Sequence, residues 1–335
     1  MLIQHTRVVD EATLSEFRAK AMTSNISSDF AKEFLRLFIC PVCKTQLEVS
    51  EEHLICENGH RVPIINGSPD FFVFSENVTE EKISQSSFHD DEENNEKFSE
   101  IVFRPYAENN KTHISSWLYH LNHFKKVLPA KLSIELENTT ILNCGCGGGF
   151  EAEFFAQNGA LMVGFDISQL RVEASATRFK LNDLPGLFYR GEAVTLPFRD
   201  NSFDLVLYHD SLHHVPIEEI PIAIREAARV AKKGVVLLEA NDSPFRLLLE
   251  LIGLSISVEA SGNYAFKFKK NLMEFWASKY SLELVNYSVL FTKKEHCPKI
   301  YAIPVFGWLA YKLVRIAGLF LKPIGNEACI ILKKP

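Results

Sequence analysis

A glycine-rich stretch and one aspartate form the clearest chemical pattern in this sequence. The stretch TTILNCGCGGG, residues 139–149, joins a β-rich run to closely spaced glycines, and a helix-like segment follows. Glycine tolerates positive φ and lets a ligand approach the backbone, and the free N–H groups of a helix start favour an electron-rich or anionic group. Asp166 ends the next apolar run, where an acidic residue commonly binds ribose hydroxyls. The spacing therefore predicts a ligand site built from this loop and Asp166.

Three cysteines and one histidine nearer the amino terminus have the spacing of a metal site. Cys40 and Cys43 form a Cys-x-x-Cys pair, and Cys56 with His60 supplies a second pair after a hairpin-length interval. Zinc binds such ligands in a tetrahedron, and a site with four protein ligands is structural. So small a module has little core, so the metal would supply most of its folding energy. Unmetallated thiols and a reducible disulfide are the alternatives, and His53 is a second-choice ligand.

The elements that must position these residues alternate between strand and helix. Apolar, strand-like runs cover residues 139–143, 161–165, 187–189, 203–208 and 235–239, and helical spacing lies between them, as in residues 217–231. This alternation predicts an α/β fold with a parallel, doubly wound sheet, whose ligand lies at the carboxyl ends of the strands.

The sequence resembles the class I S-adenosylmethionine-dependent methyltransferases over residues 139–242, where four motifs follow one another in the order typical of that family. The resemblance implies a mostly parallel, seven-stranded, Rossmann-like sheet and S-adenosylmethionine as cofactor. Residues 145–149 would lie against its methionine and ribose parts, Asp166 would bind the ribose hydroxyls, and Glu192 and Ala193 would flank the adenine. Asn143 stands where the family commonly has an acidic residue, and an amide adds no negative charge there. The cofactor residues predicted in this way are Asn143, Gly145, Gly147, Gly149, Asp166, Ile167, Glu192, Ala193 and His209.

The segment HDSLHH, residues 209–214, holds the candidate catalytic groups because it follows the fourth strand. Methyl transfer is an in-line displacement that alignment alone can accelerate, and a base is needed only for a weakly acidic acceptor such as a hydroxyl. A neutral histidine suits that task. We therefore predict His209 and His213 as candidate bases and Asp210 as their orienting partner, with purely structural histidines as the alternative. The predicted reaction is methyl transfer to a small-molecule or lipid-linked acceptor, at oxygen, with carbon or nitrogen as alternatives.

Residues 40–72 also resemble the short zinc ribbons of bacterial ribosomal-RNA guanine methyltransferases. That resemblance implies an RNA base methyltransferase as an alternative function. Acidic side chains outnumber basic ones in residues 36–72, however, and an RNA-binding surface normally needs a basic patch. We therefore expect a packing or substrate-gating role for the ribbon. A non-catalytic cofactor-binding partner protein is a further alternative, supported only by Asn143.

The chain divides into four predicted parts. They are a helical segment in residues 1–38, the zinc ribbon in 39–75, an acidic linker in 76–104 and the methyltransferase domain in 105–335.

A hydrophobic content of 47% with 23% charged residues over 335 residues is that of an ordinary soluble protein. The amino terminus has no apolar segment of signal-peptide length, so the sequence predicts a cytoplasmic location.

Two apolar segments have alternative interpretations. Lys312 and Arg315 interrupt the apolar insertion at residues 300–325, which argues against a transmembrane span. As a helix, residues 305–322 would lie on a membrane surface, giving a peripheral location at the inner membrane, or would form a lid on the enzyme's own core.

Apolar residues at helical spacing in 117–128 predict a core helix, with Tyr106 and Trp117 as alternative substrate contacts.

Overall fold

A computed structural model describes residues 35–50, 52–74, 78–91, 111–243, 266–290, 309, 325 and 327–335. Most of the predicted amino-terminal helical segment, Tyr106, the side chain of Trp117 and nearly all of the apolar insertion at 300–325 lie outside these residues. Within the described part of the chain, no helix is both long and apolar enough to cross a membrane.

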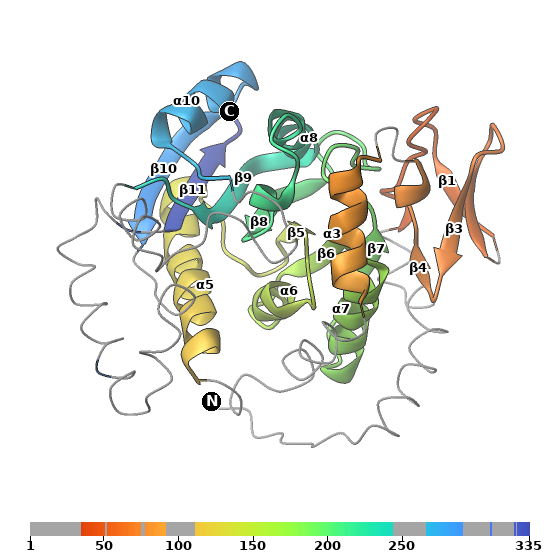
Figure 1. Cartoon of the computed structure of the whole chain (residues 1–335), viewed down its shortest axis with the longest axis horizontal. Coiled ribbons are helices and arrows are strands. Elements are labelled where there is room, and N and C mark those ends of the chain that lie inside the picture. Colours follow the sequence, from red (N-terminus) through yellow and green to blue (C-terminus); the bar gives the residue numbers. More distant parts are fainter. Residues whose placement is uncertain are drawn as a thin grey trace.

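The main body is a seven-stranded sheet with the strand order β10-β11-β9-β8-β5-β6-β7 (Figure 1). Five strands are parallel, and β11 runs antiparallel to both of its neighbours, β9 and β10. The doubly wound, mostly parallel sheet predicted from the sequence is therefore confirmed. The strands are β5 (Thr140–Cys144), β6 (Leu161–Asp166), β7 (Gly186–Arg190), β8 (Phe203–His209), β9 (Ala231–Ala240), β10 (Glu283–Leu290) and β11 (Glu327–Lys333).

Successive side chains of a strand point to opposite faces of the sheet, and here both sets are apolar. Helices therefore cover both faces. Ile141 of β5 packs in one core cluster with helices α5, α6 and α7, whereas its neighbour Leu142 packs in the other with α8 and α10. Leu121, Phe124 and Leu128 of α5 are buried in the first cluster, as the core interpretation of this helix predicted. The helices are α5 (Lys111–Leu132), α6 (Phe150–Ala156), α7 (Gln169–Leu181), α8 (Ile220–Val230) and α10 (Lys270–Lys279).

A small four-stranded antiparallel sheet packs beside β7, at the edge of the large sheet (Figure 1). The contact is aromatic, because the rings of Phe38 and Phe71 stack 4.9 Å apart and both meet the ring of Tyr189. The Phe71 amide also donates to the Arg190 carbonyl at 2.8 Å. This small sheet consists of β1 (Leu47–Val49), β2 (His53–Cys56), β3 (Arg61–Ile65) and β4 (Ser68–Pro69). The sheet and the residues that flank it, 38–50 and 52–72, are called the amino-terminal module below.

The interval predicted as an acidic linker contains a helix, so the linker interpretation is wrong for that part. Helix α3 (Glu80–Asp90) begins at Thr79, whose hydroxyl accepts from the Lys82 amide at 3.3 Å, and it packs against α7. Charge alone suggested a solvated segment, but one face of this helix is buried at Lys82, Gln85 and Ser86. This buried face brings the helix to the candidate site.

Candidate active site and metal centre

The glycine loop turns sharply between β5 and α6. Gly145, Gly147 and Gly149 have φ values of 66°, 51° and 77°, a region that residues with side chains rarely adopt. A Cβ on Gly145 would lie 2.6 Å from the Ser211 Cβ, and one on Gly149 would lie 3.0 Å from the Ser175 Cα. A Cβ on Gly147 would meet nothing within 4 Å. Packing therefore requires two of these glycines, whereas Gly147 leaves the backbone open to a ligand.

Asp166 holds this loop from the end of β6. Its Oδ2 accepts from the Gly147 amide at 2.9 Å, and its Oδ1 accepts from the Ser168 amide at 3.0 Å. The carboxylate is buried, and each of its oxygens has a second lone pair for a ligand. Asp166 thus both shapes the glycine loop and faces the cavity beside it.

The cavity has a volume of about 360 Å³ and lies at the carboxyl ends of β5, β6 and β8. This is the point where the order of the strands reverses, the usual place for ligands in such sheets. Seven predicted residues line it, namely Gly145, Gly147, Asp166, Ile167, Glu192, Ala193 and Asp210. Four do not, namely Asn143, Gly149, His209 and His213. Asn143 is buried within β5, and its side-chain nitrogen has no hydrogen-bond partner among the described residues.

Sequence reasoning missed the contribution of α3 to this cavity. Lys82, Gln85 and His89 are spaced three and four residues apart, lie on one face of the helix and line the cavity. Thr79, followed by two glutamates in the first turn, is a helix-start signal that could have revealed this helix. Arg171 and His214 are further lining residues that were not predicted.

A buried ion-pair cluster closes one side of the cavity. The Lys82 ammonium lies 2.6 Å from Glu192 Oε2 and 2.8 Å from Glu219 Oε2, and the three side chains are 5%, 7% and 14% exposed. Burial lowers the pKa of Lys82, but the hydrogen bonds and charges of the two carboxylates outweigh it and raise the pKa overall. Lys82 is therefore charged, and one oxygen of Glu192 is already occupied.

His209 lies inside the protein and not at the cavity. Its Nδ1 is 3.1 Å from Glu151 Oε1, and its ring packs edge-on against the ring of His120. Burial lowers the pKa of His209, but its hydrogen bond to Glu151 and the charge of Asp210 raise it to about 9. At neutral pH this imidazole is protonated and ion-paired, a geometry that does not suit a general base.

His213 has a different environment, and its partner is not the predicted one. Its Nδ1 lies 2.6 Å from Glu239 Oε2, at the end of β9. Glu239 is fully buried, and its other oxygen accepts from the Ser211 and Leu212 amides at 3.0 and 2.7 Å. Burial raises the pKa of Glu239, but His213 and these amides lower it overall. Glu239, and not Asp210, therefore orients His213; an acidic residue at the end of a predicted strand was its only sequence signal.

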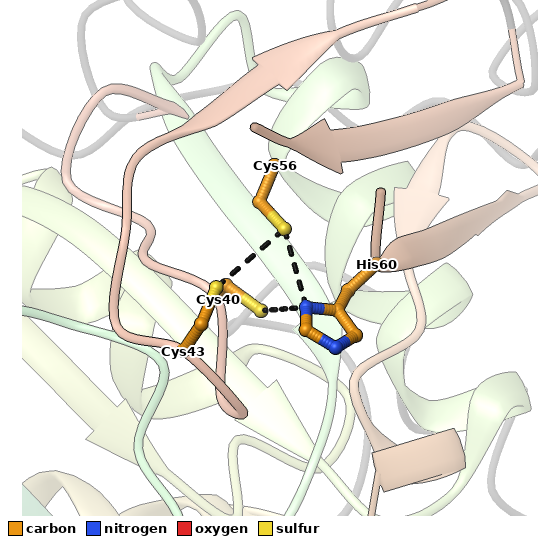
Figure 2. A group of neighbouring side chains, drawn as sticks. All are labelled: Cys40, Cys43, Cys56 and His60. Atoms are coloured by element: carbon orange, nitrogen blue, oxygen red, sulfur yellow. Dashed lines mark hydrogen bonds between the residues drawn. The ribbon is translucent and has the colours of Figure 1, made fainter. Parts of the chain in front are cut away.

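The predicted metal ligands come together in the amino-terminal module (Figure 2). Their four ligand atoms all lie within 4.8 Å of one another, and the cysteines are free thiols. The Cys43 and Cys56 sulfurs are 3.6 Å apart, and His60 Nδ1 is 3.3 Å from the Cys56 sulfur and 3.5 Å from that of Cys40. A zinc tetrahedron with Zn–S bonds of about 2.3 Å has edges of about 3.8 Å, so the donor set fits this ion. His53 pairs with Pro63 across β2 and β3 and is not part of this group.

Hydrogen bonds favour the thiolate form of Cys43, the form in which a cysteine binds a metal, whereas burial raises the pKa of Cys40. The Cys43 sulfur lies 3.1 Å from the Thr45 hydroxyl. Hydrogen bonds from the side chains of Asn58 and Thr45 lower the pKa of Cys43 to about 5.

Comparisons with known proteins identify the part of the chain that carries the cavity. Residues 142–238 match the family described as "Methyltransferase domain". A phthiotriol/phenolphthiotriol dimycocerosates methyltransferase of Mycobacterium ulcerans is 30% identical over 134 residues, which are 39% of this chain and 46% of that protein. The 27-O-demethylrifamycin SV methyltransferase of Amycolatopsis mediterranei is 37% identical over 97 residues, which are 28% of this chain and 35% of that protein. The chain thus spans less than half the length of these relatives.

A solved structure shows the same fold. Magnesium protoporphyrin IX methyltransferase from Synechocystis PCC 6803, with bound SAH, superposes with a TM-score of 0.55 at 16% identity, covering 76% of this chain and all of that one. The family match thus assigns a methyltransferase domain to residues 142–238, and this likeness, with the strand order, shows that the fold is Rossmann-like.

Proposed function

We propose that this protein is an S-adenosylmethionine-dependent methyltransferase that binds its cofactor in the cavity at the ends of β5, β6 and β8. The observation that carries the proposal is the joint position of Gly147 and Asp166, which are hydrogen-bonded to each other and both line that cavity. When bound, the cofactor supplies an electrophilic methyl group on a positively charged sulfur.

The lining residues suit the parts of this cofactor. Asp166 would accept hydrogen bonds from the ribose hydroxyls, while Gly145 and Gly147 would leave room for the methionine part. Ile167, Glu192 and Ala193 would hold the adenine, and the Glu192 oxygen that does not pair with Lys82 could accept from its amino group. The remaining predicted cofactor residues act indirectly, because Asn143, Gly149 and His209 shape the walls without lining the cavity.

We assign the role of general base to His213, oriented by Glu239. His213 is not itself a lining residue, but its chain neighbours Ser211 and His214 are, so the proposal requires its ring to reach the acceptor from the edge of the cavity. The hydrogen bond to Glu239 occupies Nδ1, so Nε2 is the atom that accepts a proton from the acceptor. Asp210 lines the cavity and would add negative charge to the site of a positively charged cofactor. A weakly acidic acceptor, such as a hydroxyl, needs this base, and the proposal is therefore O-methylation.

The acceptor that we propose is a small molecule or a lipid-linked molecule. Two relatives are named for complex small-molecule or lipid acceptors, phenolphthiotriol dimycocerosates and 27-O-demethylrifamycin SV. The apolar segment 300–325 supports such an acceptor and peripheral membrane contact through residues 305–322. RNA is the alternative acceptor, and the shortage of basic residues in residues 36–72 argues against it.

We propose in addition that Cys40, Cys43, Cys56 and His60 hold a structural zinc ion. The support is the near-tetrahedral spacing of their sulfur and nitrogen atoms. With four protein ligands the ion has no open position for a substrate. Its role is to hold the amino-terminal module together.

The test uses methyl-labelled S-adenosylmethionine. The purified protein is incubated with host extract separated into RNA, protein, lipid and small-molecule fractions, and the label is counted in each. Label in the lipid or small-molecule fraction is expected, with strongly reduced transfer by the Glu239→Gln variant, in which an amide nitrogen faces His213. Label in RNA would refute the proposed acceptor class, and label in no fraction together with no cofactor binding would refute the enzyme itself.

A further inference from the structure

We propose that Arg190 is a positioning residue for the cofactor site, through which the amino-terminal module and α3 hold the cavity-lining loop after β6. This inference rests on the proposed function, because it concerns the loop that begins at Ile167, directly after Asp166 at the end of β6. It gives the amino-terminal module a role in cofactor binding that needs no contact with substrate.

The Arg190 guanidinium joins three separate parts of the chain. Its Nε donates to the Ile167 carbonyl at 2.9 Å, Nη1 to Asp70 Oδ2 at 3.3 Å and Nη2 to the Ser86 hydroxyl at 3.2 Å. Asp70 belongs to the end of the amino-terminal module, Ser86 to α3 and Ile167 to the loop after β6. The guanidinium also lies 4.7 Å from the centre of the Phe72 ring. Only a planar group with several fixed donors can make these contacts together.

The same loop receives further support from α3. The Ser86 hydroxyl lies 3.3 Å from the Ile167 carbonyl. Asp90 accepts from the Ser168 hydroxyl at 2.6 Å and from the Leu170 amide at 3.3 Å. The start of α7 is therefore bound from outside the methyltransferase domain, and the Asp166 carboxylate is bonded to the Ser168 amide in this same turn.

Burial makes the contact between Arg190 and Asp70 sensitive to substitution. The two side chains are 21% and 2% exposed. Burial raises the pKa of Asp70, and Arg190 and the Phe72 amide oppose that change. Loss of the guanidinium would leave a buried carboxylate with one remaining amide donor and an Ile167 carbonyl without its strongest donor. The loop would then lose the geometry that presents Asp166 to the cavity.

The first measurement is the dissociation constant of S-adenosylhomocysteine by calorimetry. Arg190→Gln is expected to weaken binding by about tenfold or more, since hydrogen bonds from a charged donor are lost, with partial recovery in Arg190→Lys. Arg199→Gln is the matched control, because exposed Arg199 also joins the module to the main domain through Gln46, at 2.8 Å, but does not contact the loop. It should leave binding within twofold of wild type.

The second measurement is hydrogen exchange at the Ser168 and Leu170 amides, which needs no ligand. Faster exchange in Arg190→Gln than in Arg199→Gln is expected. Should Arg190→Gln fail to fold, Asp70→Asn and Ser86→Ala remove single contacts of the same group. A folded Arg190→Gln protein with wild-type affinity and wild-type exchange would overturn the inference. Wild-type protein that binds no S-adenosylhomocysteine would overturn the proposed function instead, and the exchange data would still decide the role of Arg190.

Discussion

The buried cluster around Lys82 permits a quantitative prediction about stability. Lys82→Met keeps the length of the side chain and removes the charge that lies 2.6 and 2.8 Å from two carboxylates. All three groups are at least 86% buried, so water compensates only weakly for the lost partner. Removing one member of a buried ion pair costs about 3–5 kcal/mol, because a buried charge is left uncompensated. We expect a decrease in the free energy of unfolding within this range.

The deficit should depend on pH in a defined direction. In the variant, Glu192 and Glu219 repel each other when both are ionised, and a proton on either carboxylate relieves the repulsion. The deficit is therefore largest at pH 8 and smaller at pH 5. In the wild type the pKa of Lys82 is raised, so its stabilising contribution is fully present below about pH 10.5 and is lost only above it. The wild-type contribution of Lys82 is thus constant between the two pH values.

Urea titrations followed by circular dichroism measure this deficit at both pH values. Lys270→Met is the matched control, because Lys270 pairs with Glu274 on the surface, where the side chains are 63% and 53% exposed, and its loss should cost under about 1 kcal/mol. Combining Lys82→Met with Glu192→Gln should recover part of the loss, since one of the two uncompensated charges is gone. A deficit no larger than that of the control, or one that is equal at pH 5 and pH 8, would refute this account of the cluster.

Three further predictions concern single groups. Asp166→Ala should weaken S-adenosylhomocysteine binding by about 1–3 kcal/mol in calorimetry, and unchanged affinity would remove Asp166 from the site. Because the pKa of His209 is raised to about 9, its contribution to the free energy of unfolding is fully present below about pH 6.5 and is lost as pH rises through 9. Glu151→Gln should weaken that dependence in denaturation at several pH values, because only the charges of Asp210 and Glu239 would still raise the pKa, and an unaltered pH profile would contradict the pairing. Cys43→Ser should lower both the zinc content and the melting temperature; wild-type values of both would exclude Cys43 as a ligand, and a wild-type protein without zinc would exclude the metal.

The fold could be predicted because its signals are local. Each parallel strand is a short apolar run that ends at a turn, and strands alternate with helical segments, so the order of elements follows from the sequence. The carboxyl ends of parallel strands meet at one edge of the sheet, which explains why the glycine loop and Asp166 were predicted together, whereas Glu192 was predicted from the family resemblance. The metal ligands could also be predicted from local signals, because two short turns carry all four.

The missed residues depend on contacts between distant parts of the chain. Lys82 and Glu192 are 110 residues apart in sequence, and no local pattern indicates that they pair. Charge in the interval around α3 pointed to a solvated linker, although Thr79 carries a helix-start signal. Helix α3 packs against α7, and this packing buries one face of the charged segment. Residues of that face therefore line the cavity.

The segment HDSLHH shows which properties of the site follow from the sequence and which follow only from the tertiary structure. Residue types and their place after an apolar strand were sufficient to predict that this segment lies at the carboxyl edge of the sheet, beside the glycine loop. They could not assign roles to its histidines, because two imidazoles four residues apart differ only in what surrounds them. Tertiary packing buries His209 beside Glu151 and brings the His213 ring within hydrogen-bond distance of Glu239, at the end of another strand. Burial and a neighbouring carboxylate determine the pKa and orientation of an imidazole, and both are properties of the folded chain.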